Sequence, residues 1–285
     1  MLLVLVSALT VAVLACFVVL VPACLGSDRV RSVVTDRRRF RLRLRTAAPY
    51  LGALAVVLAI NKGVLDLTEA FAQQHGIEAT AWFHAIEGNL VGRMQTAFPE
   101  WSLYYFGPMY VVGYAVLLTF PLLAYLFVDE PRALLTLLIS YAINYAVGVV
   151  CYTAVLAYGP RNYPADPAET DPASVTASTA TADQPLFNAF PAVTELTSQV
   201  NVHTNVFPSL HASLSLTVFI LAVSTRRELP RWTLVAGVLA ASVVLSTMYL
   251  GIHWAVDVVA GGGLAVGSVV AATRIVDRVR DDAGW

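Results

Sequence analysis

The residues whose types and spacing could carry out chemistry begin with His253 and Asp257, which stand four positions apart within the apolar stretch 246–261. On a helix this spacing places both side chains on one face, within reach of each other. A carboxylate beside an imidazole fixes its tautomer and stabilises the imidazolium, which prepares the ring to act as a base or a nucleophile. A single His–Asp pair more often has only a structural role, in which the two side chains hydrogen-bond each other at a helix end. A catalytic interpretation therefore needs further residues.

The composition indicates what kind of protein must position this pair. Of the 285 residues, 58% are hydrophobic and only 13% are charged, and the mean hydropathy is +0.68. Soluble domains carry about a quarter charged residues, so this composition predicts an integral membrane protein. The three cysteines, Cys16, Cys24 and Cys151, all lie in apolar segments, which favours small hydrophobic side chains over disulfides or metal ligands.

Apolar runs long enough to cross a bilayer recur along the chain and predict an all-α integral membrane protein with about seven transmembrane helices. The predicted spans are residues 2–25, 47–67, 103–128, 133–157, 207–224, 232–250 and 254–275. They divide the chain into an N-terminal helix with a basic loop (1–46), a six-helix core (47–275) and a cytoplasmic tail (276–285).

Two segments between the spans have patterns of their own. Residues 71–98 carry apolar side chains at helical spacing, with polar residues between them, which predicts one amphipathic helix lying on the outer membrane surface. Residues 165–200 begin with a stretch rich in Ala, Thr, Ser, Asp and Pro that has no hydrophobic periodicity. That composition predicts a flexible extracytoplasmic loop.

Arginine placement predicts the orientation of the helices. Eight of the 17 arginines lie between Arg29 and Arg45. Such a run could bind nucleic acid, but beside a membrane span it is typical of a cytoplasmic anchor that touches anionic lipid headgroups. With this run inside, only Arg93 and Arg161 fall outside. We therefore expect a multi-pass protein of the cell membrane, with its N-terminus outside, its C-terminus in the cytoplasm, and lipids rather than nucleic acid as partners.

Three further polar residues fall at the same depth as the His–Asp pair. Ser209 and His211 open one predicted span and Arg161 follows another, all at the outer face. Arg161 offers an always-charged fork for phosphate oxygens, and Ser209 stands where free helix N–H groups favour an anion. His211 can act as the general acid for a departing oxygen, while His253 can attack phosphorus and Asp257 can hold it. Distant residues that meet in this way are what a catalytic site needs.

A metal centre is an alternative use of the histidines. His203, His211 and His253 could supply the three convergent ligands that a metal needs. No His-x-His or His-x3-His spacing supports such a site, so we predict that no metal is required.

The polar motifs resemble two of the three signature motifs of the type 2 phosphatidic acid phosphatase superfamily. Pro-Ser-Leu-His at 208–211 is similar to that family's Pro-Ser-x-His, and Ser-Thr-x5-His-x3-Asp at 246–257 is similar to its Ser-Arg-x5-His-x3-Asp. The resemblance covers about residues 47–275 and implies a six-helix core without a metal or other cofactor. It implies these roles: His253 the nucleophile that forms a phosphohistidine, Asp257 its partner, His211 the acid, and Arg161 and Ser209 phosphate binders.

Two cations of the family's motifs are missing from this chain. Ala154 stands where the first motif, Lys-x6-Arg-Pro, has its lysine, although Arg161 matches the arginine. Thr247 replaces the arginine of the last motif. Loss of both cations is similar to the branch that contains inositol phosphorylceramide synthase. Thr247 and Tyr249 are candidates to replace the lost contacts to phosphate.

We predict an enzyme that hydrolyses or transfers a phosphoryl group of a lipid phosphate, through a phosphohistidine, at the extracytoplasmic face. Two other classes stay open: a transporter whose path these residues line, and a non-catalytic scaffold with a degenerate phosphate site. Transporters usually carry polar groups near the middle of the membrane, whereas the middles of these spans are apolar. A scaffold has no need of the complete set His211, His253 and Asp257.

Overall fold

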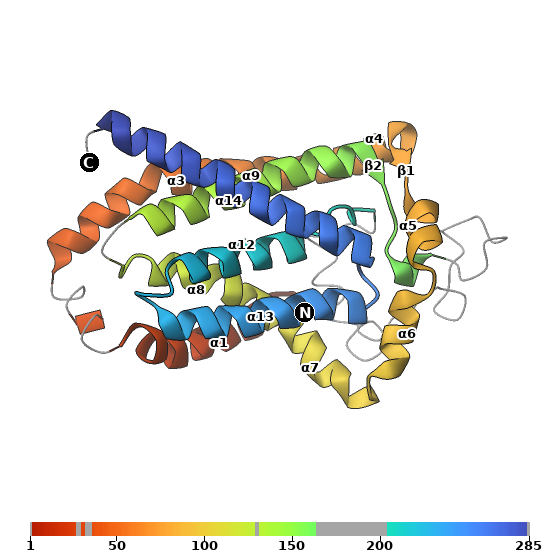
Figure 1. Ribbon diagram of the computed structural model, residues 1–285, viewed down its shortest axis with the longest axis horizontal. Helices are drawn as coiled ribbons and strands as arrows, with labels where there is room; N and C mark the ends of the chain where they lie inside the picture. Colours follow the sequence, from red (N-terminus) through yellow and green to blue (C-terminus); the bar gives the residue numbers. More distant parts are fainter. Residues whose placement is uncertain (1, 27–29, 32–35, 129–130, 164–203, 284–285) are drawn as a thin grey trace.

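The computed structural model describes residues 2–26, 30–31, 36–128, 131–163 and 204–283 (Figure 1). Within this part of the chain, six helical stretches are long and apolar enough to cross a membrane, and Leu210–Ser224 is a shorter apolar helix. The prediction of an all-α integral membrane protein with several spans is therefore confirmed. The predicted loop at 165–200 and His203 lie outside the described residues.

The apolar helices run roughly along one direction in this view (Figure 1). They are α1 (Leu2–Leu20), α3 (Arg37–Gly63), α9 (Arg132–Ala154), α12 (Leu210–Ser224), α13 (Pro230–Tyr249) and α14 (Ala255–Ala283), with one further span in three pieces. The pieces are α7 (Leu103–Pro108), the π-helical turn η3 (Met109–Gly113) and α8 (Tyr114–Ala124). A second π-helical turn, η1 (Val21–Leu25), follows α1.

Helix α12 lies at the centre of the bundle and packs against α8, α9, α13 and α14 (Figure 1). Its side chains Leu214, Val218 and Ala222 are completely buried. A helix that is hydrophobic on every side is expected in such a position, since it has no face that needs water. The start of α12 carries two of the predicted site residues, so this central helix holds part of the site on the most enclosed element of the fold.

A polar cluster of four side chains lies within the core, one level below the start of α12. The Asn144 amide donates to the Ser268 hydroxyl at 2.8 Å and to the Thr217 hydroxyl at 3.3 Å. The Ser213 hydroxyl donates to the Asn144 carbonyl oxygen. The span interiors are thus less uniformly apolar than the sequence suggested. Because these groups satisfy one another, the cluster ties α9, α12 and α14 together without exposing a polar group to lipid.

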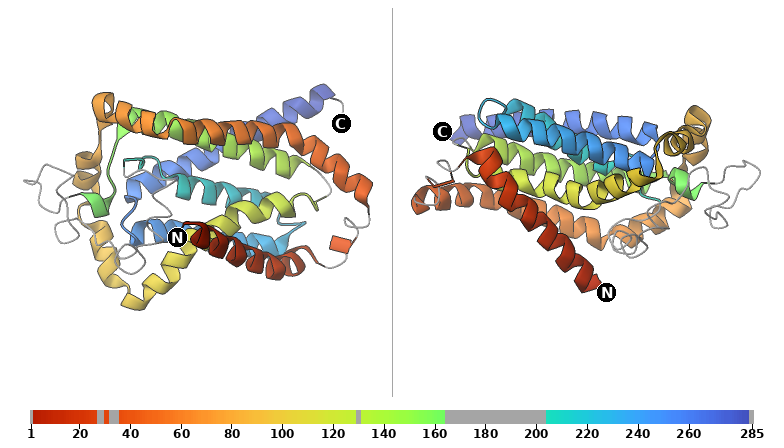
Figure 2. Two further views of the ribbon diagram at one scale, coloured as in Figure 1. Left: turned by 180° about the vertical axis from the view of Figure 1, so that it is seen from behind. Right: turned by 90° about the horizontal axis from the view of Figure 1, so that it is seen from below.

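Helix α1 leans away from the other helices, as the right-hand view of Figure 2 shows. Its apolar side chains are largely uncovered, with Leu3 82% and Val18 75% exposed. A helix with so much uncovered apolar surface is what a lipid-facing span requires. The division into one N-terminal helix and a six-helix core stays a prediction.

The segment between α3 and α7 is broken, so the prediction of a single amphipathic helix over 71–98 is wrong. It contains α4 (Leu65–His75), β1 (Ile77–Glu78), α5 (Thr80–Glu87), α6 (Leu90–Ala97) and the 3-10 turn η2 (Glu100–Ser102). Gly88 ends α5 with a φ of 55°, a left-handed conformation that glycine adopts without steric cost. Most residues of the apolar stripe are helical, as predicted, but the chain turns between α4, α5 and α6.

Strand β1 pairs in parallel with β2 (Val155–Leu156), which follows α9. Helix α9 therefore ends at Ala154, before the predicted limit of that span at residue 157. At the opposite end of the bundle, α3 already begins at Arg37 and α14 continues to Ala283, through most of the predicted tail. The transmembrane helices extend beyond their apolar runs because arginine has a good intrinsic helix propensity.

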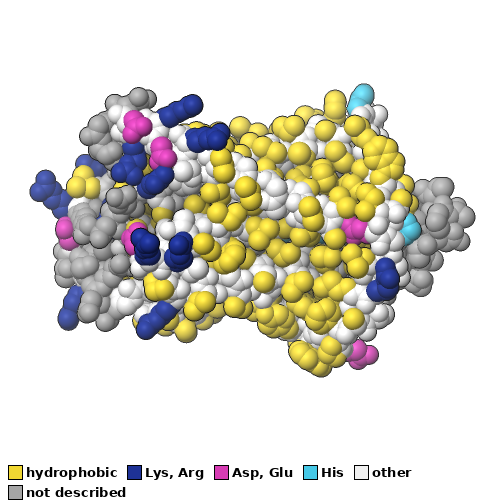
Figure 3. All heavy atoms as spheres, viewed as in Figure 1, with side chains coloured by type: hydrophobic (Ala, Val, Ile, Leu, Met, Phe, Trp, Pro, Cys, Tyr) yellow, Lys and Arg dark blue, Asp and Glu magenta, His cyan; other side chains and the backbone are white. Residues whose placement is uncertain are grey.

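Charged side chains gather at one end of the bundle (Figure 3). We call this the arginine end, and it includes the start of α3, the turn between α12 and α13, and the last turns of α14, with arginines at 37–45, 226–231 and 274–280. The opposite end, the site end, carries β1, β2, α5 and α6 (Figure 1). The predicted site residues all belong to the site end.

Candidate active site

Three segments that are far apart in the sequence meet at the site end: 155–163 after α9, 204–209 before α12, and 250–254 between α13 and α14. The Arg161 N–H donates to the Gly251 carbonyl at 3.0 Å, and the Ser209 N–H donates to the Asp257 carbonyl at 3.0 Å. The Trp254 indole N–H donates to the Tyr158 carbonyl at 2.8 Å. These contacts, together with the bridge between Ala157 and Asn205, bring together the five residues predicted to share one depth.

The His253–Asp257 pair forms where α13 gives way to α14. Gly251 has a φ of 67°, which turns the chain after α13. The Thr247 carbonyl accepts the His253 N–H at 3.2 Å and so holds the residue in place. The Asp257 carboxylate accepts the Trp254 N–H at 2.8 Å and lies 3.5 Å from Nδ1 of His253. Asp257 therefore closes the first turn of α14 and faces the imidazole at once.

Both members of the pair are enclosed, with His253 2% and Asp257 0% exposed. The pKa of His253 is lowered to about 3, mainly by burial and also by the nearby positive charge of Arg161, while the Val206 carbonyl acts in the opposite sense. The ring is therefore neutral at physiological pH. With Nδ1 facing Asp257, Nε2 is the nitrogen of the neutral ring that can attack an electrophile.

Ser209 and His211 lie at the start of α12. The Ser209 hydroxyl accepts the Ala212 N–H at 3.2 Å and caps the helix. The His211 ring is 6.0 Å from that of His253, centroid to centroid. It also stacks on Tyr110 at 4.8 Å and contacts Tyr114 at 4.6 Å. His211 is thus held between the nucleophile candidate and two aromatic rings.

Arg161 lies in the 3-10 turn η4 (Pro160–Asn162). Burial lowers the pKa of its guanidinium, but an arginine stays charged in any case. The preceding Gly159 passes so close to the Ile252 carbonyl that any Cβ there would collide with it. This close approach places Arg161 beside the loop that carries His253, where its charge can balance that of a phosphate.

The two weaker phosphate candidates have other contacts. The Thr247 hydroxyl donates to the Val244 carbonyl at 2.7 Å, within its own helix. The Tyr249 ring packs against Phe106 at 4.8 Å, in a small aromatic cluster on the side of α7. Lys62 and Arg93, which could have covered the position of Ala154, are both exposed. The described contacts therefore link neither the Thr247 side chain nor the Tyr249 side chain to the His253 ring.

Sequence reasoning did not single out Tyr110 and Tyr114. They stand four positions apart in and beside η3, and both contact His211. A single π-helical turn inside an α-helix is often found at a functional site, but no sequence signal reveals such a turn. Among the described residues, no group of three His, Cys, Asp or Glu side chains could hold a metal ion, and His203 lies outside that set.

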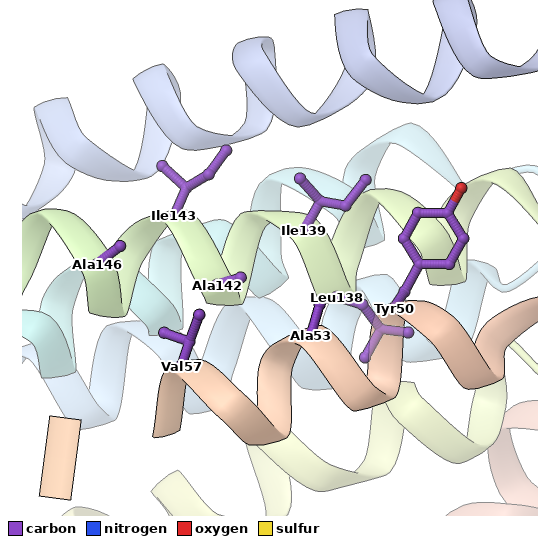
Figure 4. Close-up of a pocket in the computed structure, with 8 residues that line it drawn as sticks. All are labelled: Tyr50, Ala53, Val57, Leu138, Ile139, Ala142, Ile143 and Ala146. Carbon is purple, nitrogen blue, oxygen red and sulfur yellow. The ribbon is translucent and has the colours of Figure 1, made fainter. Parts of the chain in front are cut away.

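A hollow in the described part of the chain lies away from this site, between the middles of α3 and α9 (Figure 4). It has a volume of about 300 Å³. Its lining is apolar except for one tyrosine: Tyr50, Ala53, Val57, Leu138, Ile139, Ala142, Ile143 and Ala146. It contains no group that could act as an acid, base or nucleophile near neutral pH, so it is not the site of a reaction.

Fold and site define a multi-span membrane protein with an enclosed cluster of two histidines, an arginine and a carboxylate at one end. The model of the PAP2 superfamily matches residues 68–271. The chain therefore belongs to the PAP2 superfamily, and its function is of the phosphatase type. No curated protein and no solved structure matched the chain.

Proposed function

We propose that this protein is a membrane-embedded phosphatase or phosphotransferase that acts on a lipid phosphate through a phosphohistidine. One observation carries the proposal: a neutral, enclosed His253 with Asp257 at 3.5 Å from Nδ1, and with Arg161 close enough to affect its charge. A nucleophile, its orienting carboxylate and a cation for phosphate oxygens are the parts that phosphoryl transfer through a covalent intermediate needs.

In the first step, Nε2 of His253 attacks phosphorus and the bond to the leaving oxygen breaks. His211, which is protonated when the anionic phosphate is bound beside it, gives its proton to that oxygen, so the alcohol leaves neutral. Asp257 accepts the Nδ1–H and stabilises the positive charge that develops on the ring. Arg161 and the positive end of the α12 dipole balance the charge of the phosphate oxygens.

In the second step, a hydroxyl oxygen attacks the phosphorus of the phosphohistidine and His211 takes its proton. The phosphorus–nitrogen bond breaks, and His253 returns to its neutral form. The attacking hydroxyl decides the type of enzyme. Water makes the protein a phosphatase, and the hydroxyl of a lipid or a polyol makes it a synthase.

The missing cations favour a singly charged phosphate. A phosphomonoester carries close to two negative charges, and each charge-assisted hydrogen bond to it contributes about 1.5–3 kcal/mol. Ala154 and Thr247 stand where the family motifs carry cations, so the site keeps only Arg161 of the three. A phosphodiester needs fewer cations, so we favour a phosphodiester lipid donor and a transferase of the inositol phosphorylceramide synthase-like branch.

The proposed location of the reaction is the outer leaflet of the cell membrane. Arginines concentrate at the end opposite the site, and positively charged ends of membrane helices stay in the cytoplasm. On this orientation the N-terminus lies outside and the C-terminus inside.

The test is an assay of purified protein against a panel of lipid phosphates and phospholipids, with and without free inositol or another polyol. We expect a phosphoryl-enzyme that is labile in acid, absent from His253→Ala, and a new labelled lipid when the acceptor is present. Release of free phosphate with no transfer product under any acceptor would leave a plain phosphatase. Loss of activity in EDTA with recovery in zinc would overturn the phosphohistidine scheme.

A further inference from the structure

Helix α5 touches every segment that builds the site, although none of the family motifs lies in it. Its inward face consists of Thr80, Phe83, His84 and Glu87, spaced i, i+3, i+4 and i+7, which is one face of a helix. The opposite face carries Trp82 and Ile86, which are 64% and 70% exposed. The helix thus turns one face toward the site and an apolar face outward.

The first contact is with the segment that carries Arg161. The Thr80 side chain is completely buried, and its hydroxyl accepts the Tyr158 N–H at 3.0 Å. The Tyr158 carbonyl in turn accepts the indole N–H of Trp254, the neighbour of His253. Thr80 therefore holds the strand-like segment that connects α9 to Arg161.

The middle of the helix contacts the other two segments through rings. Phe83 packs against Phe207 at 5.4 Å, just ahead of Ser209. His84 packs against Trp254 at 6.0 Å. These contacts fix the approach of α12 and of the His253 loop to the same short helix.

The last contact consists of two hydrogen bonds to the Glu87 carboxylate at the end of α5. The two carboxylate oxygens of Glu87 accept the N–H groups of Ala255 and Val256, at 2.8 and 2.5 Å. These residues lie between His253 and Asp257 in the chain. The first N–H groups of a helix have no partner within the helix and attract negative charge. Because Asp257 takes the Trp254 N–H, two carboxylates together occupy the start of α14.

We infer that α5 is the positioning element of the site and that Glu87 is its key positioning residue. Glu87 fixes the turn that sets His253 against Asp257. Together with Asp257, it also fills the anion-binding start of α14. The inference rests on the proposed function, since it assigns Glu87 a part in the same reaction.

The test compares Glu87→Ala and Glu87→Gln in the full-length protein, on whichever phospholipid the wild type turns over. Misplacement of reacting groups by about 1 Å costs about a hundredfold in rate. We expect Glu87→Ala to lower kcat by about a hundredfold with KM nearly unchanged. Glu87→Gln, which keeps an acceptor oxygen, should lose less. Formate should restore part of the activity of the alanine variant.

Two controls separate a positioning role from a structural one. Glu100→Ala removes an exposed glutamate at the same end of the molecule, and Ile86→Ala alters the outward face of α5. Both should keep the wild-type kcat. Hydrogen exchange in the peptide 250–260 should be faster in Glu87→Ala, while the melting temperature stays close to that of the wild type.

The results distinguish this inference from the proposed function. If the wild type turns over lipid phosphates and both Glu87 variants match it in kcat, the positioning role is wrong and the proposed function stands. If Glu87→Ala does not fold, Glu87→Gln decides: a lower kcat at an unchanged melting temperature supports the role, and full activity overturns it. If the wild type forms no phosphoryl-enzyme, the proposed function fails, and faster exchange in Glu87→Gln still reports the contact with α14.

Discussion

The two ends of the bundle use charge in opposite ways. At the arginine end, cations such as Arg226 and Arg227 are exposed and stand apart from the packed core. At the site end, His253 and Asp257 are enclosed and lie 3.5 Å apart. An exposed charge loses little hydration free energy and can interact with lipid headgroups. A buried charge loses much more hydration free energy, so it needs partners that hold it in a defined orientation. The difference supports the proposal that one end sets the position of the protein in the membrane and the other performs the chemistry.

The largest expected effect comes from removing the nucleophile. His253→Ala should lower turnover of the phospholipid by at least about 10³-fold, as expected when an essential nucleophile is lost. Arg226→Ala, the matched change at the arginine end, should leave kcat unchanged. The measurement is steady-state turnover of both purified variants. A comparable loss of turnover in His253→Ala and Arg226→Ala would contradict the proposed functional difference between the two ends.

An all-or-none difference between the two ends is expected when engineered cysteines are labelled from outside whole cells. Glu100→Cys at the site end should react with an impermeant thiol reagent, and Arg226→Cys should react only after lysis. Both positions are exposed on the protein itself. The opposite pattern of labelling would place the site in the cytoplasm.

A smaller effect is expected for Asp257→Asn. The carboxylate orients His253 and stabilises its positive charge, so we expect a loss of about 10²–10⁴ in kcat, the range seen when such a partner is neutralised. The asparagine can still accept the Trp254 N–H, so the melting temperature should change little. Turnover and thermal unfolding measured on one sample check this. Unfolding without a specific loss of kcat would make Asp257 a helix cap alone.

The smallest effect is a dependence of stability on pH that originates at the site end. His253 keeps a pKa of about 3 in the folded protein, against about 6.5 when unfolded. Between these values the unfolded chain binds a proton that the folded one does not, so the free energy of unfolding falls as the pH falls. From pH 6.5 to 5 the loss due to His253 is about 1.6 kcal/mol. Melting curves of wild type and His253→Gln at both pH values measure the pH dependence, which should be smaller in the variant.

Much of the fold could be predicted from the sequence because a membrane imposes a strong length and composition rule on every span. The predicted spans agree with the helices to within a few residues at the site end, as at Leu210–Ser224. They differ at the arginine end, where α3 begins at Arg37. Hydropathy marks the bilayer, and a helix does not have to stop where the bilayer does.

The sequence by itself determined which residues could do the chemistry and that they share one end of the bundle. His211, His253 and Asp257 stand at positions where helix spacing and span direction leave little freedom. Only the tertiary structure decided what holds them. Glu87 and Tyr110 lie in no recognisable motif, and their contacts join segments separated by 168 residues in the case of Glu87 and Ala255. Such contacts depend on how α5 and the π-helical turn η3 pack against the bundle, and local sequence patterns do not predict that packing.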